Sequence, residues 1–233
     1  MTHAEKFAAA RVRHSGFVID SSFDIRHSSF SAGRAFTLIE LIVVVAVIII
    51  LVGLVLSTVG YVQKKAARSR AETEIAAMSA AVENYKADNG IYPRDCATTN
   101  QLNSANQGNP ADYATASRYL YGEVTGDHDF DGSTDSGARS YMTLKPTSLL
   151  RADMSQPPSL SNPVTAIRDP FGNSYGYSTA YANYLDYQSQ LSNCAPPTPV
   201  PTGYNPSFDL WSTAGLTTNP PTSTDQNQWI KNW

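Results

Sequence analysis

Four aspartates lie close together in the second half of the chain, with a spacing that suits a metal ion. Asp127, Asp129, Asp131 and Asp135 occupy positions 1, 3, 5 and 9 of one stretch, and Gly132 stands at position 6. This pattern is typical of an EF-hand-type calcium loop, because carboxylate oxygens converge on a hard cation while glycine permits a sharp turn. Position 12 is alanine rather than the usual bidentate acid. The stretch predicts either a calcium site with a dissociation constant on the order of 0.1–1 mM or a solvated acidic turn.

The only two cysteines, Cys96 and Cys194, both follow a long apolar run. If that part of the chain is exported, its compartment permits a disulfide. Closing a loop of this length would stabilise the fold by about 4–5 kcal/mol in the chain-entropy model. Two unpaired thiols are the alternative.

Histidine is scarce after the apolar run, where His128 stands alone. This scarcity undercuts a Ser-His-Asp or Cys-His catalytic set and any multi-histidine metal site in this part of the chain. The net charge of −3, with 16% charged residues, also gives no basic footprint for nucleic acid. We therefore expect a protein that is not an enzyme and has no nucleic-acid partner.

A segment long enough to cross a membrane precedes the acidic loop and the cysteines. From Leu41 to Leu56 every residue is apolar or glycine, and the wider segment 36–60 has one charge, Glu40. The 24 residues Phe36–Val59 would span about 36 Å as a helix, which is enough to cross a bilayer core of about 30 Å. Residues 1–35 show no sustained apolar period and are expected to be a leader.

The same helix is predicted to continue through residues 61–90. Ile75, Met78, Val82 and Tyr85 recur at spacings of three and four, which indicates one apolar face. Asp88-Asn89-Gly90 followed by Tyr92-Pro93 is a strong helix stop, with glycine at the left-handed cap.

Residues 91–233 are expected to form an exported head. Short apolar and aromatic runs alternate with turn signals, which favours a small antiparallel sheet with long loops. The predicted strands are Ser117–Tyr121, Tyr141–Leu144, Asn173–Tyr177 and Phe208–Ser212, and Ala195–Pro206 is a proline-rich surface loop. The fold class is therefore α+β, with one long amino-terminal helix packed on a small antiparallel sheet.

Residues 33–41, Gly-Arg-Ala-Phe-Thr-Leu-Ile-Glu-Leu, lead directly into the apolar run. This segment resembles the prepilin peptidase recognition site of type IV pilins and type II secretion pseudopilins. The resemblance implies cleavage between Ala35 and Phe36, removal of residues 1–35, and N-methylation of the new Phe36 amine. The family usually has glycine directly before the cut, whereas here Gly33 stands two residues before Ala35.

Glu40 is the fifth residue of the predicted mature chain, where the family places its glutamate. A carboxylate in a membrane helix costs up to about 2.5–3.5 kcal/mol at the bilayer centre, so it should have a partner. The free amine of a neighbouring subunit's Phe36 would neutralise it and set the stagger between subunits. The alternative is a glutamate that only reaches to the water interface.

The apolar run is also compatible with a removable secretory signal cut near Thr58-Val59-Gly60, or with an ordinary single-pass anchor. The distribution of basic residues opposes export of the head. Lys64, Lys65, Arg68 and Arg70 follow the run, and the positive-inside rule would keep them in the cytoplasm.

Further segments resemble the major pseudopilin of type II secretion. Residues 85–93 are similar to its helix end, 169–175 (Asp-Pro-Phe-Gly-Asn-Ser-Tyr) to its Asp-Pro-Trp-Gly turn, and 208–212 to its last strand. The chain departs from that family at Ser57, where proline is usual, and at 213–216, where the family's calcium loop carries an aspartate.

The resemblance implies a pilin-like subunit held in the bacterial inner membrane, with its head in the periplasm. Its expected partners are copies of itself, a prepilin peptidase and methyltransferase, minor pseudopilins and an inner-membrane assembly platform. The implied function is a structural one in a pseudopilus that drives the export of folded proteins. The alternatives are a type IV pilin of a surface pilus and a membrane-tethered calcium- or glycan-binding protein that never polymerises.

Overall fold

The computed structural model describes residues 36–201 and 203–233, so the predicted leader with Gly33 and Ala35 lies outside the described residues. The helices are α1 (Leu38–Asn89), α2 (Ala114–Thr125), α3 (Ala180–Gln188) and α4 (Ser223–Gln228), with 3₁₀ turns η1 (Ser104–Asn106) and η2 (Pro146–Ser148). The strands are β1 (Leu149–Leu150), β2 (Ala166–Ile167), β3 (Gly176–Ser178), β4 (Asp209–Ser212) and β5 (Ile230–Lys231).

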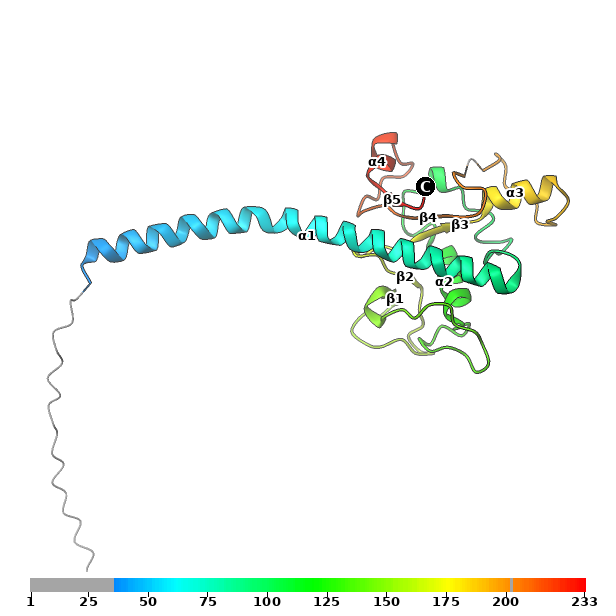
Figure 1. Ribbon diagram of the computed structural model, residues 1–233, viewed down its shortest axis with the longest axis horizontal. Coiled ribbons are helices and arrows are strands. Elements are labelled where there is room, and N and C mark those ends of the chain that lie inside the picture. The colour runs from blue at the N-terminus through cyan, green and yellow to red at the C-terminus, as the bar shows by residue number, and fades with distance from the viewer. Residues whose placement is uncertain (1–35, 202) are drawn as a thin grey trace, which may run out of the picture. The chain divides into compact units, whose positions relative to one another are not determined.

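The chain divides between Val52 and Gly53 into two compact units, and α1 begins in the first and ends in the second (Figure 1). Among the described residues of the first unit, 36–52, the large apolar side chains are exposed by 47–80%. An 18-residue window of α1 has a mean hydropathy of 3.4, and none of it is buried. Among the described residues, α1 is the one helix that is long and apolar enough to cross a bilayer.

In the second unit α1 becomes amphipathic. Ala71, Ile75, Met78 and Val82 are buried at spacings of four, three and four, which places them on one helix face. Tyr85, the next residue of the predicted face, is half-buried and donates its hydroxyl to Glu123 of α2 at 2.7 Å. The continuous helix predicted from residue 36 is thus confirmed, beginning two residues later at Leu38.

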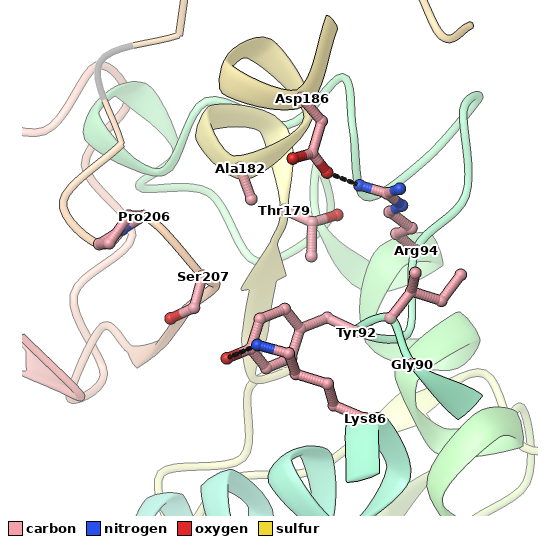
Figure 2. A pocket seen from close by; sticks show the side chains of 10 residues that line it. Lys86, Gly90, Tyr92, Arg94, Thr179, Ala182, Asp186, Pro206 and Ser207 are labelled. Carbon is pink, nitrogen blue, oxygen red and sulfur yellow. Dashed lines mark hydrogen bonds and ion pairs between the residues drawn. The ribbon is translucent and has the colours of Figure 1, made fainter. Parts of the chain in front are cut away.

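The predicted helix stop is also confirmed. Gly90 adopts a φ of +78°, and its N–H donates to the carbonyl of Lys86 at 2.7 Å. Figure 2 shows the corner that follows, where the Lys86 ammonium donates to the Tyr92 hydroxyl at 3.0 Å and Arg94 pairs with Asp186 of α3. The 230 Å³ cavity at this corner is thus lined by charges that already bond to one another or to Tyr92.

Two small antiparallel sheets complete the head. β1 pairs with β2, with Leu149 opposite Ile167. The second sheet has the order β3-β4-β5, in which Trp211 of β4 lies opposite Gly176 of β3 and Lys231 of β5. The predicted α+β, pilin-like architecture is therefore confirmed.

The strand predictions succeed only in part. Four of the five residues of Phe208–Ser212 form β4, which begins at Asp209, while only the last two residues of Asn173–Tyr177 belong to β3. The prediction for Ser117–Tyr121 is wrong, because this run lies in α2. Its buried residues recur at helical spacings of three and four: Ser117, Leu120, Tyr121 and Val124.

The prediction of a strand at Tyr141–Leu144 is also wrong. The N–H groups of Tyr141 and Met142 both donate to the carbonyl of Val124, at 2.8 and 3.0 Å. These donors therefore satisfy an acceptor near the end of α2 rather than a neighbouring strand.

Strand β4 runs between two apolar clusters. Leu210 joins Met78 and Val82 of α1 in the larger cluster, while Trp211 packs with Tyr113 and other aromatic residues in the smaller one. Successive side chains of a strand point to opposite faces, so adjacent residues of β4 serve both clusters. All four residues of β4 are buried.

The position of Gly176 against Trp211 yields a stability prediction. A Cβ atom at Gly176 would lie 2.1 Å from Cε2 of Trp211, so Gly176→Ala forces the indole or the strand to move. We expect this substitution to lower the free energy of unfolding by about 1–3 kcal/mol, measured by urea denaturation. In the control, Gly60→Ala, a Cβ would meet nothing within 4 Å and should leave stability equal or slightly higher. Equal denaturation midpoints for Gly176→Ala and the native chain would contradict this packing.

Candidate functional site

The start of α1 forms a capping box around Glu40. Thr37 precedes the first helical residue, and its N–H and hydroxyl both donate to Oε2 of Glu40 at 2.8 Å. In return, the Glu40 N–H donates to the Thr37 hydroxyl oxygen at 3.3 Å. Such reciprocal bonds satisfy donors that a helix start leaves without partners.

Sequence reasoning selected Glu40 but missed Thr37. The signal was present, because threonine followed three residues later by glutamate before an apolar run is a capping-box pattern. Phe36 is 80% exposed, and its predicted bond to a neighbouring Glu40 stays a prediction.

Helix α1 continues unbroken through Ser57, where the resembled family usually has proline. The Ser57 hydroxyl donates to the carbonyl of Leu54 at 2.8 Å, and that of Thr58 donates to Val55 at 2.9 Å. These bonds keep both hydroxyl groups satisfied within the helix, which matters in an apolar environment.

The segment 169–175 forms a turn that is held by its first residue. Oδ1 of Asp169 accepts the N–H groups of Phe171 and Asn173, at 3.0 and 2.8 Å. Its Oδ2 accepts the hydroxyl of Ser212, at the end of β4, at 2.5 Å. Gly172 adopts a φ of +97°, which favours glycine at this position. One buried carboxylate thus fixes the turn to β4.

A second buried carboxylate acts in the same way at the other end of β4. Asp209 accepts the N–H groups of Tyr204 and Asn205, at 3.0 and 2.9 Å, and the Ser104 hydroxyl at 2.5 Å. Burial raises the pKa of both Asp169 and Asp209, and the hydrogen bonds they accept oppose that rise. Asp169 and Asp209 therefore have a structural role, because their carboxylate oxygens accept hydrogen bonds from within the head.

The acidic loop brings three of its four predicted ligands together. Ligand oxygens of Asp127, Asp129 and Asp135 lie within 4.8 Å of one another. Asp131 is not part of this group, and its Oδ1 accepts the N–H and hydroxyl of Ser133 at 2.8 and 2.5 Å. The structure therefore narrows the candidate donor set to three carboxylates.

The loop is preformed around its buried member. Asp127 is 1% exposed and accepts the Tyr121 hydroxyl at 2.5 Å and the Gly132 N–H at 2.8 Å. Gly132 has a φ of +96°, as the predicted sharp turn requires. Desolvation raises the pKa of Asp129. The hydrogen bond that Asp129 accepts from the Asp131 N–H opposes this rise, whereas the hydrogen bond with Asp127 and the charges of Asp131 and Asp135 add to it.

Three convergent carboxylates fit a hard cation, because a divalent ion would offset the repulsion between their negative charges. Asp127, Asp129 and Asp135 would hold the ion. Calcium binding itself stays a prediction.

In the structure Cys96 and Cys194 are bonded across a separation of 98 residues, with Cα atoms 5.5 Å apart. The amide of Gln101 donates to the carbonyls of Cys96 and Ala195, at 3.0 and 3.3 Å. The bridge and this amide tie the proline-rich loop to the segment after α1. The presence of this disulfide in the isolated protein stays a prediction.

A membrane-length helix that continues into an α+β head, with a capped glutamate near its start, defines a pilin-like class of chain. Residues 58–129 match the family model of type II secretion system (T2SS), protein G. The match covers less than a third of the 233 residues and includes the amphipathic part of α1, α2 and the beginning of the acidic loop. It confirms the resemblance to the type II secretion pseudopilins over these residues, while the segment 33–41 and Asp169 lie outside it.

No curated protein and no solved structure matches the chain.

The cysteine pair predicts a redox-dependent stability. Replacing both residues in Cys96→Ser/Cys194→Ser should lower the free energy of unfolding by about 4–5 kcal/mol, because a long loop in the unfolded chain is no longer closed. Urea denaturation of the full chain in detergent measures this change. Reduction of the native chain should have the same effect and leave the double variant unchanged. A native chain that is indifferent to reductant would contradict the bridge.

The acidic loop predicts a calcium response. Calcium at ten to a hundred times its dissociation constant should raise the free energy of unfolding by about 1.4–2.7 kcal/mol. Asp129→Asn should abolish this rise, since it removes one of the three convergent carboxylates. Asp131→Asn, a matched loss of charge outside the group, should retain it. Thermal unfolding with and without calcium distinguishes the variants, and equal responses from both would refute the narrowed donor set.

Proposed function

We propose that this chain is a structural subunit of a type II secretion pseudopilus. The observation that carries the proposal is the match of residues 58–129 to T2SS protein G, which begins on the same helix that bears the exposed apolar segment. That family consists of structural components of the secretion apparatus, and we assign this chain no catalytic role.

In this proposal the precursor waits in the inner membrane, with α1 as a single-pass anchor and the head in the periplasm. A prepilin peptidase cuts between Ala35 and Phe36 and methylates the new amine. Phe36 and Thr37 precede the first residue of α1, which supports the accessibility of the chain at this point.

Assembly would use the apolar side chains of α1 together with Glu40. Both hydrogen bonds from Thr37 go to Oε2, and among the described residues Oε1 has no hydrogen-bond partner. The carboxylate can thus keep its cap while Oε1 accepts a hydrogen bond from the Phe36 amine of a neighbouring copy. Pairing in an apolar filament core would neutralise two charges that are costly to bury alone.

The growing filament would push folded cargo toward the outer membrane. Copies of this chain, minor pseudopilins and an inner-membrane assembly platform are its proposed partners. The match to protein G favours this role over a surface pilus, since the two alternatives share the apolar segment and differ in the part that follows.

Two substitutions at the start of α1 test the proposal. Glu40→Ala should abolish filament formation and the export of cargo, because an unpaired amine in the core costs about 3–5 kcal/mol. Thr37→Ala removes the same capping box but keeps the carboxylate, so it should still form filaments. Filaments in sheared fractions and secreted enzyme activity give the readouts.

Wild-type assembly by Glu40→Ala would contradict the proposal. Equal loss in both variants would show that the cap, and not the charge pair, controls assembly.

A further inference from the structure

A cavity with a volume of 720 Å³ lies in the second unit, beside α1. Tyr61, Lys64, Lys65 and Arg68 line it from one side, at the spacing of a single helix face. The opposite wall comes from the loop after β4, including Leu216, and from Phe171 of the Asp169 turn. Its volume falls within the range of about 300–1,000 Å³ that is typical of small-molecule sites.

The cavity combines positive charge with apolar surface. Its lining residues include three cations and no acid. Arg68 donates to the carbonyls of Gln228 and Trp229, at 2.7 and 3.4 Å, and lies 3.5 Å from Glu72. Among the described residues, Lys64 and Lys65 have no ion-pair partner. The ammonium groups of Lys64 and Lys65 therefore lie at a cavity whose other walls include aromatic and aliphatic side chains.

The segment directly before the cavity is apolar and exposed within the same unit. Leu54, Val55 and Leu56 are 61–68% exposed, and Tyr61 is 72% exposed. Tyrosine at the end of a membrane segment is typical of the interface between lipid and water. The position along α1 thus puts the lysines at headgroup depth if the preceding residues lie in a bilayer.

We propose that this cavity binds the headgroup of an anionic phospholipid. Lys64 and Lys65 would bind the phosphate, and Tyr61, Phe171 and Leu216 would contact the glycerol and the first acyl carbons. A lipid fits better than an acidic protein because the apolar membrane segment continues directly into the basic groove. The inference depends on membrane insertion and is independent of filament assembly.

This site gives the basic residues after the apolar run a role other than setting orientation. Their number opposes export of the head under the positive-inside rule. If Lys64 and Lys65 bind lipid phosphate on the exported side, this binding would offset part of the cost of exporting them, since each lysine is attracted to an anionic membrane surface.

Lipid exchange in nanodiscs tests the proposal with the full chain. The chain is placed in nanodiscs of phosphatidylcholine alone or of equal parts phosphatidylcholine and phosphatidylglycerol, and retained lipid is identified by native mass spectrometry. Lys64→Gln/Lys65→Gln should reduce retention of phosphatidylglycerol about 10- to 30-fold, given the attraction per lysine near a membrane. Arg70→Gln/Lys86→Gln removes the same charge from α1 outside the cavity and should retain the lipid.

Retention of one phosphatidylglycerol in preference to phosphatidylcholine, lost only in the Lys64/Lys65 variant, supports the site. Equal loss in both double variants would overturn it in favour of diffuse attraction. Displacement of the phosphatidylglycerol by millimolar inorganic phosphate would overturn the site in favour of one for free anions. Its displacement by an acidic peptide would overturn the site in favour of a protein partner. Failure of the native chain to enter either nanodisc would overturn the anchor as well, whereas entry without lipid preference overturns this inference alone.

Discussion

Helix α1 must satisfy two environments along one continuous backbone, and the rest of the structure follows from this constraint. Its first part exposes apolar side chains all round, so lipid or other copies must cover them. Its second part buries one face, through Met78 and Val82, in the core of the head. Polar groups mark both limits of the apolar segment: Glu40 with its cap at the start, and the basic groove at Lys64 and Lys65 at the end.

The head packs on α1 through a small core, and buried carboxylates fix the loops that its short strands cannot fix. Each strand has two to four residues, too few to fix long loops by ladder hydrogen bonds alone. Asp169 and Asp209 each gather backbone N–H groups and a serine hydroxyl at the ends of β4. Because β4 is buried on both faces, these carboxylates tie the attached loops to the core of the head.

Local signals make much of this structure predictable. The period of Ile75 and Met78, and Gly90 after the last turn, define the amphipathic helix and its end from sequence alone. The run Ser117–Tyr121 resembles a strand because five residues do not separate periods of two and 3.6, and burial against β2 and β3 decides for a helix. The role of Asp169 and the separation of Asp131 from its neighbours depend on tertiary contacts. Residue spacing does not predict such tertiary contacts, whereas the capping of Glu40 by Thr37 follows from a local sequence pattern.

In the proposed function, Phe36 becomes the amino terminus of a subunit that assembles through Glu40. Mass spectrometry of the mature protein, isolated from membranes of cells that contain a prepilin peptidase, tests it most directly. We expect a chain that starts at Phe36 and carries one methyl group on its amine. A mature chain that starts at any other residue, or that retains residues 1–35, would contradict it.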